Sequence, residues 1–352
     1  MVLLSAPPQA HDMQPSPDQH EGPSLHIAGF GDVNYSATKR LEGARGFSLG
    51  QFVLHMSSEL SPRVSFFGEL SFTARTDAGT GTPPATGFNA EIERMSIRFD
   101  HSDKLKASFG RYHTPINYWN TAFHHGQWLQ TTITRPEMIQ FGGRFLPVHF
   151  VGALVEGVTA AGGLNLNYQV GVGNGRNSVI SRAGDAGDVN GNRAVLATAF
   201  VKPDQLYGLQ AGGSVYADKV TLSSGRQFSE RIVAAHAVWN KENPELIAEF
   251  AAVRHDENTD ATATWSHAFY VQAAYRLQDT LHQYKPYFRF EHVGVNATDA
   301  VYTGVNNLDG ATLGVRYDLA AYAAVKGEYR TWTRGAGTVR NHGGFFQVSF
   351  TF

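Results

Sequence analysis

The sequence lacks several features, and each absence excludes a class of protein. None of its 352 residues is cysteine, which excludes disulfide frameworks, cysteine-ligated metals and thiol nucleophiles. No apolar run reaches the roughly 18 residues that a membrane-spanning helix needs. The 29 basic side chains do not exceed the 31 acidic ones, so the basic excess of a nucleic-acid binder is missing. We therefore expect no nucleic-acid partner.

The composition nevertheless describes a folded chain. Apolar residues make up 42% and charged residues only 17%, which excludes a disordered protein. Residues 1–24 are rich in Pro, Gln, Asp, His and Ser without periodicity, and we expect a flexible lead-in there. Its first residues are compatible with the end of a clipped secretory signal, although the basic leading segment of such a signal is missing. The folded part is expected over 25–352.

From Leu25 onward the apolar residues recur with period two, the spacing of β-strands. Met95, Ile97 and Phe99, for example, alternate with polar neighbours. The pattern predicts sixteen strands, near residues 25–36, 47–60, 64–76, 89–100, 105–113, 148–159, 164–173, 193–202, 206–217, 230–240, 245–256, 266–277, 285–296, 310–319, 322–333 and 344–352.

The connections between these strands alternate between short turns and longer polar, glycine-rich segments. An even number of antiparallel strands with this alternation is typical of outer-membrane barrels, whose turns are short on the periplasmic side and whose loops are long outside. We predict an all-β, transmembrane antiparallel β-barrel; a soluble β-protein with a packed core is the competing interpretation. The long segments are 77–88, 114–147, 174–192, 218–229, 257–265, 297–309 and 334–343.

A barrel in a membrane has to close. In hydrocarbon an unpaired backbone N–H or C=O costs several kcal/mol, so no strand edge can stay open. The last strand should therefore pair with the first. In that last strand Phe346, Val348, Phe350 and Phe352 share one face, and its aromatic final residue resembles the ending of outer-membrane barrel proteins.

The stretch from Gly110 to Ile116 reads Gly-Arg-Tyr-His-Thr-Pro-Ile and resembles the phosphate-selective porins, the porin O and P superfamily. Those proteins carry a Gly-Arg-aromatic-x-x-Pro segment where a strand runs into the long pore loop. Further likenesses follow in order, so that the resemblance covers nearly the whole chain from Leu25. They lie at residues 167–175, 245–250, 270–275, 284–291 and 312–318.

The resemblance implies a usually trimeric channel in the outer membrane of a Gram-negative bacterium, narrowed by an inward-folded loop. Its partners would be outer-membrane lipid and lipopolysaccharide, small hydrophilic solutes and two further copies of the chain. Members that select phosphate line the pore with Lys and Arg, whereas segment 114–147 has only two arginines opposed by a glutamate. Weak selectivity with a slight anion preference is expected instead.

Segment 114–147 is far longer than an ordinary hairpin loop, and its aromatic residues argue against disorder. We expect it to fold into the lumen as the pore constriction; an outer loop that caps the barrel or contacts a trimer neighbour is the alternative. The residues expected nearest the solute path are His124, His125, Trp128, Arg135, Glu137 and Arg144.

The alternation also predicts which charged side chains line the lumen. Their signs are mixed, which favours weak selectivity, and a ladder of salt bridges that stiffens the wall is an equally good interpretation. The predicted lumen-lining residues are Arg75, Arg94, Arg98, Lys106, Glu249, Arg289, Glu291, Arg316, Asp318, Lys326 and Arg330.

Three motifs are discounted. Residues 46–50 match G-x-S-x-G, but a strand and not a helix follows. His124 and His125 are adjacent, and side-by-side residues rarely chelate one metal. Residues 188–192 imitate a calcium loop without its later glycine and glutamate. We expect no catalytic residue, metal or cofactor; the alternatives to a channel are a barrel enzyme of lipase or protease type and a closed-lumen adhesin or scaffold.

Overall fold

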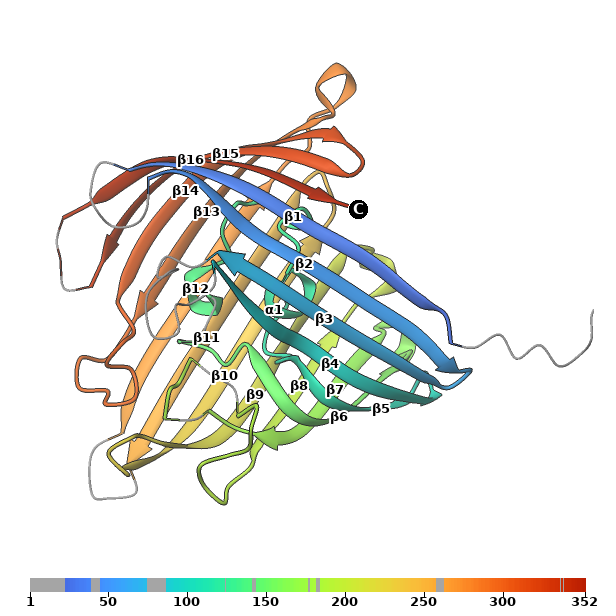
Figure 1. The fold of residues 1–352 in the computed structure, drawn as a ribbon, viewed down its shortest axis with the longest axis vertical. Coiled ribbons are helices and arrows are strands. Elements are labelled where there is room, and N and C mark those ends of the chain that lie inside the picture. Colours follow the sequence, from blue (N-terminus) through green and yellow to red (C-terminus); the bar gives the residue numbers. More distant parts are fainter. Residues whose placement is uncertain are drawn as a thin grey trace, which may run out of the picture.

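Sixteen antiparallel strands close into one barrel (Figure 1). The computed structural model describes residues 23–38, 45–74, 87–123, 125–140, 144–176, 178–181, 184–257, 263–335, 337 and 339–352. Most of the predicted lead-in, together with Arg75 and His124, lies outside these residues. No helix in the described part of the chain is both long and apolar enough to cross a membrane.

The predicted strand number and order are confirmed. The strands are β1 Leu25–Thr38, β2 Gly46–Ser61, β3 Val64–Ala74, β4 Phe88–Ser102, β5 Leu105–His113, β6 His149–Thr159, β7 Leu166–Asn174, β8 Ala194–Val201, β9 Leu209–Thr221, β10 Gln227–Asn240, β11 Glu245–Glu257, β12 Thr264–Ala274, β13 Tyr284–Gly294, β14 Leu308–Ala320, β15 Ala323–Arg334 and β16 Asn341–Thr351. The short helices are α1 Trp119–Ala122, η1 Glu137–Ile139, η2 Ala161–Gly163, η3 Asp204–Leu206 and η4 Asp279–Leu281.

The first and last strands pair, as predicted. Their register runs from Phe30 opposite Thr351 to Thr38 opposite Gly343. Beyond it, Gly29 and Phe352 exchange both backbone hydrogen bonds, at 2.8 and 3.0 Å. This pairing removes the open edge that a lipid-embedded sheet could not keep.

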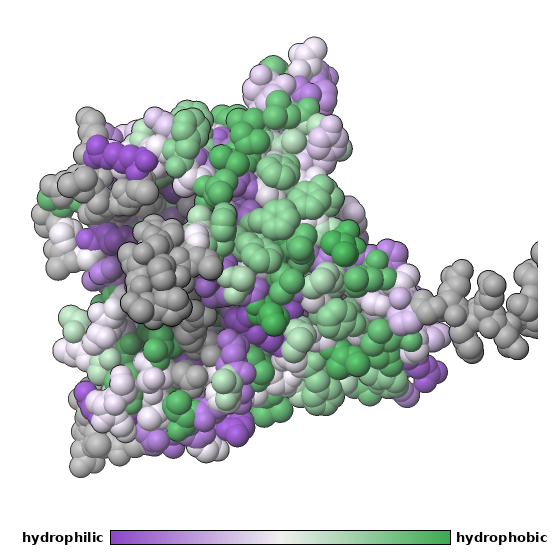
Figure 2. Space-filling view, in the orientation of Figure 1, coloured by the Kyte–Doolittle hydropathy of each residue, from purple (hydrophilic) through white to green (hydrophobic). Residues whose placement is uncertain are grey.

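The two faces of the wall differ as the alternation predicts. On β12, Val271 is 50% exposed on the outside, whereas its neighbour Gln272 is 2% exposed on the inside. On β16 the outward Phe346 and Val348 are exposed, whereas the next residue, the inward Ser349, is fully buried. Figure 2 shows the result: hydrophobic residues gather in a band over β1–β4, with hydrophilic residues nearer the rims.

Two connections differ from the predicted alternation of short and long. Segment 218–229 was expected to be a long loop, but β9 runs to Thr221 and β10 begins at Gln227. The polar residues there belong to strands that continue the ladder, with Val220 opposite Phe228. Conversely, nine residues lie between β12 and β13 on the rim of short turns, where the chain forms η4.

Strand β4 departs from strict alternation at one bulge. Glu69 pairs with Arg94 and Leu70 pairs with Ile92, so Glu93 has no partner in the β3 register. Ile92 and Met95 are both half exposed on the outside, so two consecutive residues, Glu93 and Arg94, lie on the inward side. A bulge re-aims side chains in this way. The sequence pattern therefore missed Glu93 as an inward residue.

The two faces can be tested with neighbouring residues in the middle of β4. Ile97 is 47% exposed and outward, whereas Ser96 is half-buried and lines an inner cavity. Arginine on the lipid face of a barrel costs about 2–4 kcal/mol near the bilayer midplane. We expect Ile97→Arg to lower the free energy of unfolding by that amount in urea titrations in lipid vesicles, and Ser96→Arg to change it little. The opposite ranking would mean that the faces are assigned the wrong way round.

Candidate functional site

The segment 114–147 lies against inward side chains of the wall, and we call it the inner segment. Its helix α1 lies within the ring of strands (Figure 1). The segment starts beside β8 and β9: Asn117 N–H donates to Ser214 Oγ at 3.3 Å, and its side-chain amide donates to the Phe250 carbonyl of β11 at 3.3 Å. On the other side of the ring, His125 contacts Gln51 of β2. The inner segment thus reaches opposite walls of the barrel.

Glu249 of β11 holds the start of α1. Its Oε1 accepts the backbone N–H groups of Tyr118 and Trp119 at 2.9 and 2.6 Å. These two groups precede the first helical hydrogen bond and would otherwise lack acceptors. Glu249 was predicted to line the lumen; in the structure it is 2% exposed and binds backbone.

The second half of the inner segment is held by cations of β13, β14 and β15. Arg316 donates to the carbonyls of Trp128 and Gln130 at 2.7 and 3.0 Å. Arg289 donates to the Thr134 carbonyl at 2.7 Å, and Lys326 donates to the Thr132 carbonyl at 3.1 Å. Because the segment forms no ladder of its own here, these side chains supply the partners that buried carbonyls require.

Carboxylates of β13 and β15 accept hydrogen bonds from backbone N–H groups of the inner segment. Glu328 accepts the Ile133 N–H at 2.7 Å, and Glu291 accepts the Glu137 N–H at 2.7 Å. Glu137 in turn forms a bidentate pair with Arg334 at 2.8 and 2.9 Å. Donors and acceptors on the wall therefore bind several backbone groups of the inner segment.

This arrangement changes the role of two predicted lumen-lining cations. Arg289 and Lys326 are 0% exposed because the inner segment covers them. They contact backbone and not solvent. Several predicted lumen-lining residues form ion pairs on the wall. The pairs are Arg94 with Glu69, Arg98 and Lys106 with Asp100, Arg289 with Glu291, Arg316 with Asp318, and Arg330 with Glu328.

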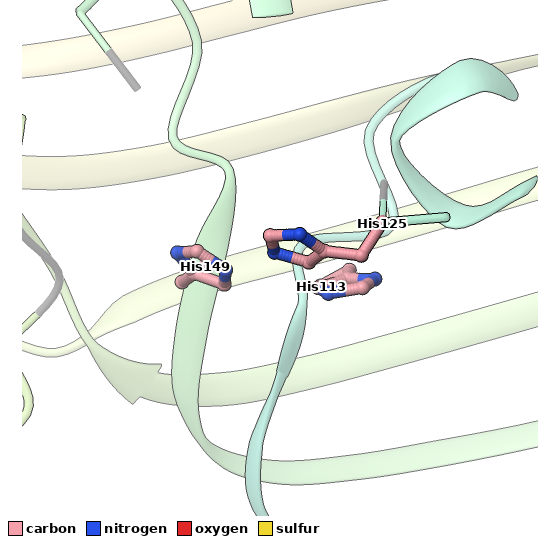
Figure 3. Close-up of side chains that lie close together, drawn as sticks. All are labelled: His113, His125 and His149. Carbon is pink, nitrogen blue, oxygen red and sulfur yellow. The ribbon is translucent and has the colours of Figure 1, made fainter. Parts of the chain in front are cut away.

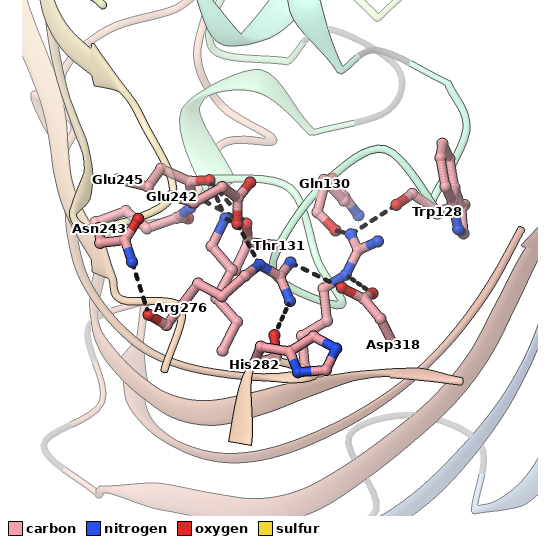
Figure 4. A network of polar contacts seen from close by, with 12 residues as sticks. Trp128, Gln130, Thr131, Glu242, Asn243, Glu245, Arg276, His282 and Asp318 are labelled. Atoms are coloured by element: carbon pink, nitrogen blue, oxygen red, sulfur yellow. Dashed lines mark hydrogen bonds and ion pairs between the residues drawn. The ribbon is translucent and has the colours of Figure 1, made fainter. Parts of the chain in front are cut away.

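A second polar network joins the inner segment to the rim of short turns (Figure 4). Thr131 donates to Glu245 at 3.0 Å, and Lys285 bridges Glu245 and Glu242 at 2.7 and 3.1 Å. Arg276 pairs with Glu242 at 2.7 Å and with Asp318 of β14 at 2.7 Å. Partial burial alone would raise the pKa of Glu242, but Lys285 and Arg276 lower it below the ordinary value. Glu242 therefore stays ionised at lower pH than a free glutamate.

The predicted constriction residues lie in different surroundings. Trp128 lies over Arg316, with the guanidinium 5.8 Å from the ring centroid. Arg135 is 3% exposed above Trp119. Arg144 is exposed and donates to the Gly304 carbonyl at 3.3 Å. His125 is 4% exposed against Gln51 and Glu93, on the far side of the lumen from Glu137 and Arg144.

Two cavities lie along the wall formed by β13–β16, on either side of residues 128–134. The first, of about 600 Å³, opens beside Thr134 and Glu137 and is bounded by Thr312, Arg330 and Trp332. Arg330 lies over Phe345 there, 3.9 Å from the ring centroid. The second, of about 380 Å³, lies toward the rim of short turns and is lined by Trp128, Arg276, His282, Gln283, Arg316, Asp318, Ala320 and Ala321.

A third cavity, of about 600 Å³, lies on the opposite side of the lumen. Serine residues of β2, β3, β4 and β5 line it together with Glu59, Arg94, Arg98 and Glu156. Its cations and carboxylates are equal in number, so it has no excess of either sign.

Comparison with solved structures supports the fold. An anion-selective porin from Comamonas acidovorans matches with a TM-score of 0.66 at 13% identity, over 94% of this chain and 100% of that one. The outer membrane channel DcaP of Acinetobacter baumannii matches with a TM-score of 0.61 at 11% identity, over 94% and 98%. OmpT, an outer membrane protein of Vibrio cholerae, matches in its trimer form with a TM-score of 0.59 at 14% identity, over 94% and 100%.

No protein-family model and no curated protein sequence matches the chain. Identities this low establish the barrel fold alone. The resemblance to phosphate-selective porins therefore stays a hypothesis.

The anchoring of the inner segment can be tested at Lys326. Lys326→Met leaves the Thr132 carbonyl without its buried donor, and an unsatisfied buried group costs about 1–3 kcal/mol. Hydrogen exchange in detergent micelles should become faster at amides 127–134 and stay unchanged in the strands. The control is Lys106→Met. The Lys106 ammonium lies 3.8 Å from Asp100 of the wall and does not contact the inner segment. Equal exchange in both variants would contradict the anchoring role.

Proposed function

We propose that the chain is a passive diffusion channel in the outer membrane of a Gram-negative bacterium, through which small hydrophilic solutes pass with a weak preference for anions. The observation that carries this proposal is the pair of cavities on the two sides of residues 128–134, along one polar wall. A sixteen-stranded barrel is wide enough for an aqueous lumen when an inner segment fills only part of it. The apolar outer band supports a lipid environment.

The charges along this wall support the anion preference. The first cavity is lined by four arginines and two glutamates, and the second by two arginines and one aspartate. Arg316, Arg330 and Arg334 keep part of their side chains exposed, unlike Arg289 and Lys326. We assign the solute path to this wall, with its narrowest part between Arg316, Arg330 and residues 128–134.

The inner segment is the proposed constriction. Trp128, Arg135, Glu137 and Arg144 line the cavities and remain assigned to it. His125 is assigned to the wall contact and not to the solute path, because its ring is buried between the segment and β2 and β4.

We also propose a homotrimer surrounded by outer-membrane lipid and lipopolysaccharide. The family resemblance and the trimer form of the Vibrio cholerae OmpT structure support it. Sedimentation of the detergent-solubilised chain should give three copies per particle; a single copy would overturn the trimer and leave the channel proposal intact.

Channel function is tested first by liposome swelling and planar-bilayer recording. Wild-type protein should admit small sugars and conduct ions. Replacing residues 120–134 by a short glycine linker should raise the single-channel conductance because it removes the segment from the lumen. Unchanged conductance would rule out the constriction, and absence of swelling and current in both forms would favour a closed-lumen barrel.

The anion preference is tested by the reversal potential in a salt gradient. A unit charge about 4 Å from an ion changes its energy by about 1 kcal/mol in water, so Arg316→Gln and Arg330→Gln should each lower the anion permeability and raise the cation permeability by up to about fivefold. Arg226→Gln is the control, because Arg226 pairs with Glu257 on the rim of long loops, away from both cavities. A shift as large in the control would show that the assigned wall does not set the preference.

A further inference from the structure

Three histidines from the inner segment and the two strands that flank it meet inside the barrel (Figure 3). His113 is the last residue of β5 and His149 the first residue of β6, and the two lie directly opposite each other in the antiparallel register. His125 approaches them from the inner segment. One ring nitrogen of each histidine lies within 4.8 Å of the others.

A buried carboxylate lies beside two of the three histidines. The bulge in β4 turns Glu93 inward, where its Oε2 lies 2.9 Å from His149 Nε2 and 3.5 Å from His125 Nε2. Glu93 is 3% exposed. Three imidazoles, and a carboxylate oxygen beside two of them, are the donor types that a tetrahedral Zn²⁺ site uses.

A second shell is present around the cluster. Gln51 Oε1 lies 3.3 Å from His125 Nδ1, which can donate to it and so turn Nε2 toward Glu93. Histidines that bind metals characteristically donate their other ring N–H to such an acceptor. Glu69, which is 0% exposed, lies 3.6 Å from His113 Nε2 and provides a second negative charge beside the group.

The charges around the cluster balance, with three arginines (Arg94, Arg111 and Arg135) beside three carboxylates (Glu69, Glu93 and Asp185). Arg94 is paired with Glu69, and Arg111 lies 3.0 Å from Asp185 as well as 3.9 Å from Glu93. Arg135 lies over the Trp119 ring, 5.1 Å from its centroid. The His149 side chain is 10% exposed and gives an ion access from the lumen.

We propose that His113, His125, His149 and Glu93 bind one divalent transition-metal ion of the Zn²⁺ class. Imidazole nitrogens favour Zn²⁺, Cu²⁺ and Ni²⁺ over Ca²⁺ and Mg²⁺, which prefer oxygen ligands. Zn–N bonds are about 2.0–2.1 Å long, so the three rings close on a common point when the ion binds. This inference does not depend on whether the barrel conducts solutes.

The ion would link the inner segment to the wall at the two residues where the segment leaves and rejoins it. His125 lies in the segment, and His113 and His149 flank it. Metal binding should therefore slow hydrogen exchange at amides 123–130 without changing exchange in strands on the opposite side of the barrel.

The test is Zn²⁺ titration of the full-length, detergent-solubilised barrel by calorimetry, with variants of the cluster. One ion per chain should bind, and His125→Ala, His149→Ala and Glu93→Gln should each weaken binding by at least about tenfold. The control replaces a matched pair elsewhere, His267→Ala with His292→Ala, whose rings stack 5.2 Å apart on the outer face. All these forms retain His11 and His20, so binding to the N-terminal segment would not respond to the variants.

A second measurement on unmodified protein keeps the proposal testable if a variant does not fold. Co²⁺ in place of Zn²⁺ should give the intense visible absorption of a four-coordinate ion, and excess Zn²⁺ should abolish it. Wild-type protein that binds no Zn²⁺, cluster variants that bind as tightly as the control, or the weak spectrum of six-coordinate Co²⁺ would each overturn the site. The histidines would then act as hydrogen-bonding partners of Glu93 and Glu69.

Discussion

The structure depends on one constraint: backbone N–H and C=O groups removed from water must find partners. For the strands this constraint requires closure, and the pairing of β1 with β16 meets it. The same constraint applies to the inner segment, which forms little ladder of its own. Its carbonyls and N–H groups are instead bound by charged side chains of the wall, including Arg289, Arg316 and Glu328. Charged groups are effective here because hydrogen bonds to ionised partners are stronger than neutral ones.

A wall built in this way performs two tasks with one set of residues. Cations that the inner segment covers completely, such as Lys326, hold its backbone and contribute little to the solute path. Cations next to the cavities, such as Arg330 and Arg334, remain partly exposed. Ion selectivity would then follow from the few charges that the segment leaves uncovered, and not from the total charge of the lumen.

The sequence predicted the sheet well because alternation is a local property of each strand. The strand number, the closure through Phe352 and the inward position of Glu249 and Arg316 all follow from period two. The prediction of a long loop between β9 and β10 was wrong because polar residues at strand ends resemble loop residues. Glu93 was missed because a bulge shifts the alternation by one residue, and composition does not reveal a bulge.

Contacts between the inner segment and the wall could not be predicted from spacing, because many of them join residues more than a hundred positions apart. The meeting of His113 with His149 is different: two residues that flank a hairpin connection face each other when the register is antiparallel. That signal was in the sequence. The approach of His125 to this pair was not, because it depends on how the inner segment folds back.

The placement of the inner segment against the β11 wall is tested most directly by a cross-link, which the absence of native cysteine makes simple to interpret. Thr131 and Glu245 are in hydrogen-bond contact at 3.0 Å, so the thiols of Thr131→Cys combined with Glu245→Cys should be joined by a short bifunctional thiol reagent in the folded barrel. Thr131→Cys combined with Glu156→Cys, whose second position is on β6, should not. A cross-link in the second pair and none in the first would contradict the placement of the segment.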